Sequence, residues 1–264
     1  MENKFEKIGF GERSYNAVAC YTVAVTEPFT AGRAASRLLF DFSIMAALIK
    51  QSEIDKPILD FGAGTGWISE FCVRMGLKTV AFDICEDLRT CLGNRVKVDR
   101  RIDQKLLECE QGDGHAMPFE HGSFGNLLCY DTLHHMHDYN KVFSEFFRVL
   151  HEGGRAIFVE PGARHSTSPE TVAFLETQKQ HDPSWIERDV VLEEINDIAR
   201  SAGFSEGISI VPTQHPLSLQ TYSMDSWSRF RNGDRQERFR LADQLADINY
   251  WDRIIFYVEK PDRR

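Results

Sequence analysis

The chain has 264 residues, of which 42% are hydrophobic, and this suffices for one large α/β domain with additions. Its formal net charge of -9 at pH 7 argues against a nucleic-acid partner, because such partners are normally bound by a basic face. A local basic patch stays open as an alternative, although we favour a solvated helix face for its five candidates, Arg229, Arg231, Arg235, Arg238 and Arg240.

The cysteine spacing and the length of the apolar runs indicate the cellular compartment that we expect for the protein. The six cysteines include no C-x-x-C pair, so a disulfide framework is not expected and a reducing compartment is the default. The first residues contain no apolar segment typical of a secretory signal, and no apolar run approaches the roughly 20 residues that cross a bilayer. We therefore expect a cytoplasmic protein that does not associate with membranes.

Residues 1–52 are expected to form an N-terminal cap or lid. The first 30 residues are weakly periodic and contain scattered aromatics, among them Tyr15 and Tyr21. Apolar residues recur at helical spacing over residues 31–51, which predicts a helix there.

Residues 58–67, with the sequence ILDFGAGTGW, are the most informative stretch of the chain. They predict a buried strand over 58–61, a tight turn, and a helix from about residue 65 to 75. Glycines allow a ligand to approach the backbone, and free N–H groups at a helix start suit a polar or anionic group. The dinucleotide fingerprint G-x-G-x-x-G would require a third glycine at the position of Trp67, so the spacing here is a compressed variant.

Strands and helices alternate through the next hundred residues, which predicts a parallel sheet. The expected strands cover residues 79–82, 106–109, 125–130 and 155–160, with helices from about residue 86 and over 139–150. Ligands of such sheets bind beyond the carboxyl ends of the strands. Four acidic residues fall at or just past these ends and should share one rim: Asp60, Asp83, Asp131 and Glu160.

The regular alternation of predicted strands and helices ends after Pro161. Residues 163–188 show little periodicity and look like an insertion, and a helix is expected over 190–202. Two last strands are expected over 208–211 and 254–258. The long polar segment between them, 213–252, contains one candidate helix lined by Phe239, Leu241, Leu245 and Ile248. Segments of this length are usually functional or disordered, so we expect residues 163–264 to supply lid insertions, the last helix and the final two strands.

Several motifs in register resemble those of class I S-adenosylmethionine (SAM) dependent methyltransferases, in the small-molecule branch called methyltransferase type 11. The resemblance covers about residues 55–162 and includes the glycine run, the Asp113 loop with Met117-Pro118-Phe119, and the segments 131–138 and 146–154. It implies an α/β fold with a doubly wound, mostly parallel, seven-stranded Rossmann-like sheet, with a SAM-binding core over residues 53–162. It also implies SAM as cofactor and S-adenosylhomocysteine as product.

The resemblance implies where the cofactor binds. Asp83 would accept hydrogen bonds from the ribose hydroxyls, Asp113 would meet the adenine amino group, and the methionine end would lie over Gly62–Gly64. For Asp60, fixing the glycine turn and contacting the ligand stay equally open. The full set of expected cofactor contacts is Asp60, Gly62, Ala63, Gly64, Gly66, Asp83, Ile84, Asp113, Gly114, His115 and Tyr130.

The histidines after the fourth strand are candidate catalytic residues. Methyl transfer is an in-line displacement, and a hydroxyl, phenol or protonated amine acceptor must also lose a proton. His135 is the first candidate base and His134 the second, while a role in shaping the pocket stays open for both. Tyr15 and Tyr21 are further candidates, although packing within the lid is favoured for them. No metal is expected, because adjacent histidines at the start of a helix diverge.

The sequence therefore predicts a SAM-dependent methyltransferase for a small molecule, with oxygen or nitrogen favoured over carbon as acceptor, working as a monomer or homodimer. One alternative is a SAM-binding sensor or inactive partner subunit. Another is a nicotinamide oxidoreductase, against which the Gly66-Trp67 step and the Asp113 loop argue.

Overall fold

The computed structural model describes residues 27–29, 32–85, 87–162, 164–180, 183, 185–212, 223–246 and 253–262, so Tyr15 and Tyr21 lie outside the described residues. The strands are β1 (Ile58–Phe61), β2 (Thr79–Asp83), β3 (Leu107–Gln111), β4 (Phe124–Tyr130), β5 (Leu150–Pro161), β6 (Ser209–Ile210) and β7 (Arg253–Glu259). The α-helices are α3 (Gly32–Leu48), α4 (Trp67–Arg74), α5 (Leu88–Val98), α6 (Tyr139–Val149), α7 (Pro169–Gln178), α8 (Leu192–Ala202), α9 (Met224–Arg231) and α10 (Arg235–Ala246).

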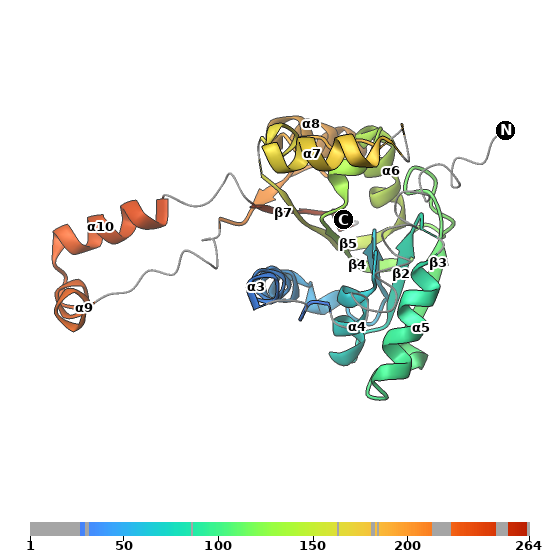
Figure 1. Cartoon of the computed structure of the whole chain (residues 1–264), viewed down its shortest axis with the longest axis horizontal. Helices are drawn as coiled ribbons and strands as arrows, with labels where there is room; N and C mark the ends of the chain where they lie inside the picture. Colours follow the sequence, from blue (N-terminus) through green and yellow to red (C-terminus); the bar gives the residue numbers. More distant parts are fainter. Residues whose placement is uncertain are drawn as a thin grey trace.

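The seven strands form one sheet in the order β3-β2-β1-β4-β5-β7-β6. Strands β1 to β5 pair in parallel, and β7 runs antiparallel between β5 and β6. Helices α3, α4 and α5 cover one face, while α6 and α8 cover the other (Figure 1). The seven-stranded, mostly parallel sheet predicted from the sequence is confirmed.

The core lies on both faces of the central strands. Every residue of β1 and β4 is buried, as expected of parallel strands covered by helices on both sides. Successive side chains along each strand point to opposite faces of the sheet. One face packs against α6 and is rich in phenylalanine, whereas the other packs aliphatic side chains against α3 and α4.

Phe158 at the centre of β5 is a test of this core. Its side chain is fully buried and stacks on Phe256 at 4.7 Å and on Phe143 at 5.6 Å between ring centroids. We expect Phe158→Ala to lower the free energy of unfolding by about 3–5 kcal/mol, because it leaves a cavity that the strands cannot close. Chemical denaturation measures this. Phe239→Ala, at an exposed position in α10, is the matched control and should change stability by less than about 0.5 kcal/mol.

Two helices depart from the expectations. Residues 163–188, which showed little periodicity, contain α7, and the segment 213–252 contains α9 as well as the expected α10. Thr171 is the one residue of α7 that is buried, so this helix leaves no apolar stripe in the sequence. Its start is nonetheless regular, because the Ser168 side chain accepts a hydrogen bond from the Thr171 N–H and proline occupies its first position.

The arginines of α9 and α10 are partly paired. Glu237 receives ion pairs from both Arg229 and Arg240, at 2.6 and 3.0 Å. This arrangement supports the interpretation of the cluster as a solvated helix face. Among the helices in the described ranges, none combines the length and the apolar character that crossing a membrane requires.

Candidate functional site

A cavity of about 610 Å³ lies at the carboxyl ends of β1, β2 and β4, a volume typical of ligand pockets. Its lining includes the glycine loop, the ends of these strands, Leu38 of α3 and a distant group around α7. The sequence-predicted residues that line it are Asp60, Gly62, Ala63, Gly64, Asp83, Ile84, Asp113, Gly114, His115, Tyr130, His134 and His135. Of the predicted cofactor contacts, Gly66 is the one that does not line it.

The three glycines of the loop have different neighbours, although all have positive φ. A Cβ atom on Gly62 would lie 2.1 Å from the Thr132 side chain, and one on Gly66 would lie 2.2 Å from Leu92. A Cβ atom on Gly64 would meet nothing within 4 Å. Packing of the protein therefore excludes side chains at Gly62 and Gly66, whereas Gly64 leaves the backbone open to a ligand.

Asp83 and Asp60 are buried beneath this loop. The Asp83 carboxylate accepts hydrogen bonds from the N–H groups of Gly64 and Cys85, both at 2.8 Å, and burial raises its pKa. Asp60 accepts from the Ser69 hydroxyl at 2.5 Å, and burial raises its pKa to about 7. Since Ser69 belongs to α4, this contact supports a role for Asp60 in fixing the turn between β1 and α4.

The loop after β3 is held by its own side chains. Asp113 Oδ1 accepts from the backbone N–H of His115 at 2.9 Å and lies 2.6 Å from His115 Nδ1. The other ring nitrogen of His115 accepts from the Asp138 N–H at 3.3 Å. Gly114 packs so closely on Phe61 that a Cβ would lie 2.4 Å from the ring. These contacts hold the loop against β1 and the start of α6.

Arg95 of α5 is a site residue that the sequence reasoning missed. It is 2% exposed, and its guanidinium donates to the Thr65 carbonyl at 2.7 Å, to Glu70 at 2.8 Å and to the Glu27 carbonyl at 2.9 Å. Glu27 also lines the cavity and bonds the Thr65 hydroxyl. Arg95 therefore ties the end of the glycine loop to α4 and to the segment before α3.

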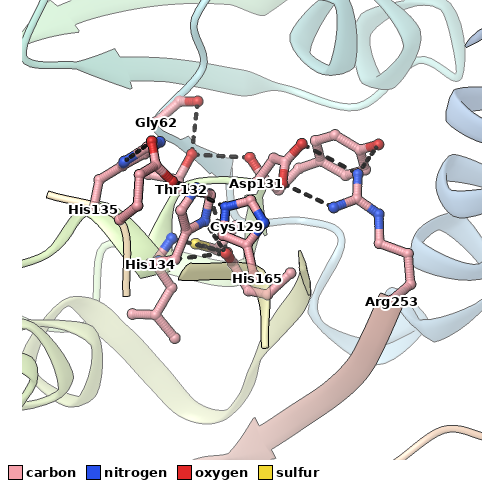
Figure 2. Close-up of polar contacts among 12 residues, drawn as sticks. Gly62, Cys129, Asp131, Thr132, His134, His135, His165 and Arg253 are labelled. Atoms are coloured by element: carbon pink, nitrogen blue, oxygen red, sulfur yellow. Dashed lines mark hydrogen bonds and ion pairs between the residues drawn. The ribbon is translucent and has the colours of Figure 1, made fainter. Parts of the chain in front are cut away.

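A second arginine, Arg253 at the start of β7, links β7 to the residues at the end of β4 and, through them, to α3. It contacts both carboxylate oxygens of Asp131, at 2.8 and 3.2 Å, and donates to the Tyr130 hydroxyl at 2.7 Å (Figure 2). Tyr130 in turn donates to Asp41 of α3 at 3.0 Å. Asp131 has a φ of +52°, an uncommon conformation outside glycine. Burial would raise the pKa of Asp131, but the Arg253 charge holds it well below its usual range.

His134 lies between two carboxylates. Its Nδ1 is 2.8 Å from Glu160 and its Nε2 is 3.3 Å from Glu187. Burial alone would lower the His134 pKa, but these two acids raise it to about 10. Glu160 is fully buried and also accepts from the N–H groups of Thr132 and Leu133, at 3.1 and 2.8 Å. Because both ring nitrogens donate, His134 is a positioning residue and has no lone pair to take a proton at neutral pH.

His135 has the opposite character. Its Nδ1 lies 3.0 Å from the Ile186 carbonyl, so this nitrogen carries the proton and Nε2 keeps a lone pair. Burial, followed by the charge on His134, lowers the His135 pKa to about 4. Its ring packs against Trp185, with centroids 5.2 Å apart. Within the described part of the chain, Nε2 shows no hydrogen-bond partner, so it is available to a ligand in the pocket.

The pocket wall that faces His135 comes from residues 163–188, the segment expected to be an insertion. Phe174, Trp185 and Glu187 line the cavity together with His165. The Trp185 indole donates to Glu187 at 2.8 Å, and its ring meets Phe174 edge-on at 6.0 Å between centroids. No motif in the sequence signals these contacts, because they depend on the chain returning to the sheet after α7.

Among known protein families, residues 59–158 match the model of the family described as "Methyltransferase domain". A demethylmenaquinone methyltransferase from Lactococcus lactis subsp. lactis is 34% identical over 115 residues, which cover 42% of this chain and 44% of the relative. A sarcosine/dimethylglycine N-methyltransferase from Halorhodospira halochloris is 28% identical over 118 residues, covering 44% and 42%. The chain thus matches less than half the length of these relatives.

Among solved structures, phosphoethanolamine N-methyltransferase 2 from Haemonchus contortus shares the fold. Its complex with phosphomonomethylethanolamine and S-adenosylhomocysteine aligns with a TM-score of 0.63 and 19% identity. The alignment covers 98% of this chain and 59% of that one, so the likeness includes the strands and helices on both sides of the family match.

Proposed function

Because the chain carries a class I SAM-dependent methyltransferase domain of type 11 over residues 59–158, we propose that it transfers a methyl group from SAM to a small-molecule acceptor. The family match confirms the class and the cofactor expected from the sequence. The observation that carries the proposal is that one cavity contains both the glycine loop with Asp83 and His135, whose Nε2 has no hydrogen-bond partner among the residues that the structure describes.

The cofactor is proposed to follow the rim of the sheet. Its ribose lies against Asp83, its adenine beside the loop of Asp113, Gly114 and His115, and its methionine end over Gly64. Gly64 supports this placement because the space above its backbone is open. Tyr130 lies at the other side of the loop, where an aromatic ring suits the positive sulfonium without competing as a nucleophile.

The proposed chemistry is an in-line displacement. The acceptor atom bonds the methyl carbon as the carbon–sulfur bond breaks, and the electron pair stays on sulfur to give S-adenosylhomocysteine. Holding the three atoms in line supplies much of the acceleration. His135 Nε2 takes the proton of the acceptor and passes it to solvent. His134, held by Glu160 and Glu187, supports the ring of His135 at 3.9 Å between centroids.

An oxygen or nitrogen acceptor is proposed because such an atom must lose a proton, which gives His135 a function. The relative named for sarcosine and dimethylglycine N-methylation supports nitrogen. The wall of Phe174, Trp185 and Glu187 bounds the space beyond His135 and supports an acceptor of small size. The open space between this wall and His135 also argues against the sensor alternative, because a blocked acceptor pocket would favour a sensor.

Calorimetric titration of the full chain with SAM, S-adenosylhomocysteine and NAD tests the proposal. We expect one site for SAM and for S-adenosylhomocysteine, and no heat of binding for NAD. A panel of small amines and hydroxylated compounds then tests transfer through release of S-adenosylhomocysteine. Binding of NAD without either SAM ligand would overturn the proposal, whereas SAM binding without transfer to any compound would favour the sensor.

A further inference from the structure

Three metal-ligating side chains converge on the pocket wall, although they are far apart in the sequence. His134, His165 and Glu187 each offer a ligand atom, and these atoms lie within 4.8 Å of one another. Glu187 Oε2 is 3.3 Å from His134 Nε2 and 2.9 Å from His165 Nε2. Ligands bound tetrahedrally to Zn²⁺ at about 2.0–2.1 Å lie about 3.3 Å apart, so small side-chain movements would admit the ion.

In each of the three side chains, the atom that would not bind the ion has a polar partner of its own. His134 Nδ1 contacts Glu160 at 2.8 Å, and His165 Nδ1 contacts the Thr171 hydroxyl at 3.3 Å. The second oxygen of Glu187 accepts from the Trp185 indole at 2.8 Å. Metal-binding histidines typically contact a carboxylate or other polar group through their second nitrogen, which fixes the ring orientation. The backing groups in this cluster already have that arrangement.

The charges of the cluster also suit a divalent ion. Glu160 and Glu187 place two buried carboxylates against the two ring nitrogens of His134. A divalent cation bound at His134 Nε2 takes the place of a proton on that nitrogen and brings positive charge close to both carboxylates. Asp131, His134 and Glu160 form a second potential group. We set it aside because the Glu160 oxygens already accept from backbone N–H groups and from His134 Nδ1.

We propose that His134 Nε2, His165 Nε2 and Glu187 bind one Zn²⁺ ion with a fourth position open to the pocket. Two histidines and one carboxylate are an established ligand set for zinc, and an open position is typical of sites where the metal meets a substrate. All three residues line the cavity, so the open position faces the side of the pocket assigned to the acceptor. Only that last assignment rests on the proposed function.

This site departs from the expectation of no metal. That expectation considered His134 together with its neighbours in the sequence, and His135 indeed points elsewhere, toward the Ile186 carbonyl. The partners of His134 come instead from residues 165 and 187, near α7. Figure 2 shows His165 beside His134, and their ring centroids are 5.1 Å apart.

Direct metal titration tests the site. The tag-free 264-residue chain is stripped with a chelator and titrated with Co²⁺, whose visible absorption intensifies in a tetrahedral site. Zn²⁺ then competes for the same site. We expect one ion per chain, displacement of Co²⁺ by Zn²⁺, and a higher melting temperature with Zn²⁺. His165→Ala and Glu187→Gln should each weaken binding at least about tenfold, since each removes one of three protein ligands.

His151→Ala is the matched control, because His151 is 43% exposed, contacts Glu53 and does not line the cavity. It should bind Co²⁺ like the parent protein. Circular dichroism and the melting temperature of each variant without metal establish that it folds. Absence of a saturable Co²⁺ spectrum, or equal affinity in the parent and in both site variants, would overturn the metal site. SAM binding measured in the presence of chelator keeps this result separate from the proposed methyltransferase activity.

Discussion

Replacing His135 with alanine is expected to lower turnover by about 10²–10⁴-fold, the usual contribution of a general base, while the Kd for SAM stays unchanged. The reason is the arrangement of its ring. Nδ1 is engaged with the Ile186 carbonyl, so the lone pair on Nε2 faces the pocket. Turnover is measured as release of S-adenosylhomocysteine with the acceptor found in the panel, and the Kd by calorimetry.

Two further variants separate proton transfer from pocket shape. His135→Gln retains a polar side chain of similar length but has no basic nitrogen, so it should be as slow as the alanine variant. Imidazole added to His135→Ala should restore part of the turnover. His121→Ala, an exposed histidine outside the pocket lining, serves as control and should be fully active. Parent-like turnover in His135→Ala would remove the base and leave His135 a role in shaping the pocket.

Much of the fold could be predicted because its signals are local. Strand β1 begins and ends at the predicted residues, Ile58 and Phe61, and α6 differs from its predicted range by one residue. A buried strand and an amphipathic helix each leave a pattern in their own sequence. Helix α7 leaves none, since it is largely exposed. Strand β5 begins at Leu150 rather than at residue 155, because it also pairs with β4 across an irregularity near Phe124.

The residues of the site also divide into those that have a local sequence signal and those that have none. Asp83 was predicted because its place at the end of β2, after the glycine run, is a property of the local sequence. The different states of His134 and His135 could not be predicted, since the two are neighbours with the same side chain. They differ because Glu160 and Glu187 contact both nitrogens of His134 in the folded chain. Spacing along the sequence does not reveal contacts of this kind.

Asp83→Ala is expected to raise the Kd for SAM more than tenfold. A hydrogen bond to a charged group is worth about 1.5–3 kcal/mol, and about 1.4 kcal/mol corresponds to a factor of ten. The Asp83 carboxylate is proposed to accept from the ribose hydroxyls, and it already fixes the Gly64 N–H at 2.8 Å. Its loss therefore removes a partner of the cofactor and also releases the loop over which the cofactor lies. Calorimetric titration with SAM and with S-adenosylhomocysteine measures the change.

The two effects of Asp83 can be told apart. Asp83→Asn keeps one acceptor oxygen, but its amide group would face a second N–H donor, so its affinity should fall between those of the parent and of Asp83→Ala. Asp55→Ala, at an exposed acid before β1, is the control and should bind SAM normally. Circular dichroism at the titration temperature shows whether each variant is folded. An unchanged Kd in folded Asp83→Ala would refute the ribose contact, because a buried carboxylate that the cofactor touches cannot be removed without cost.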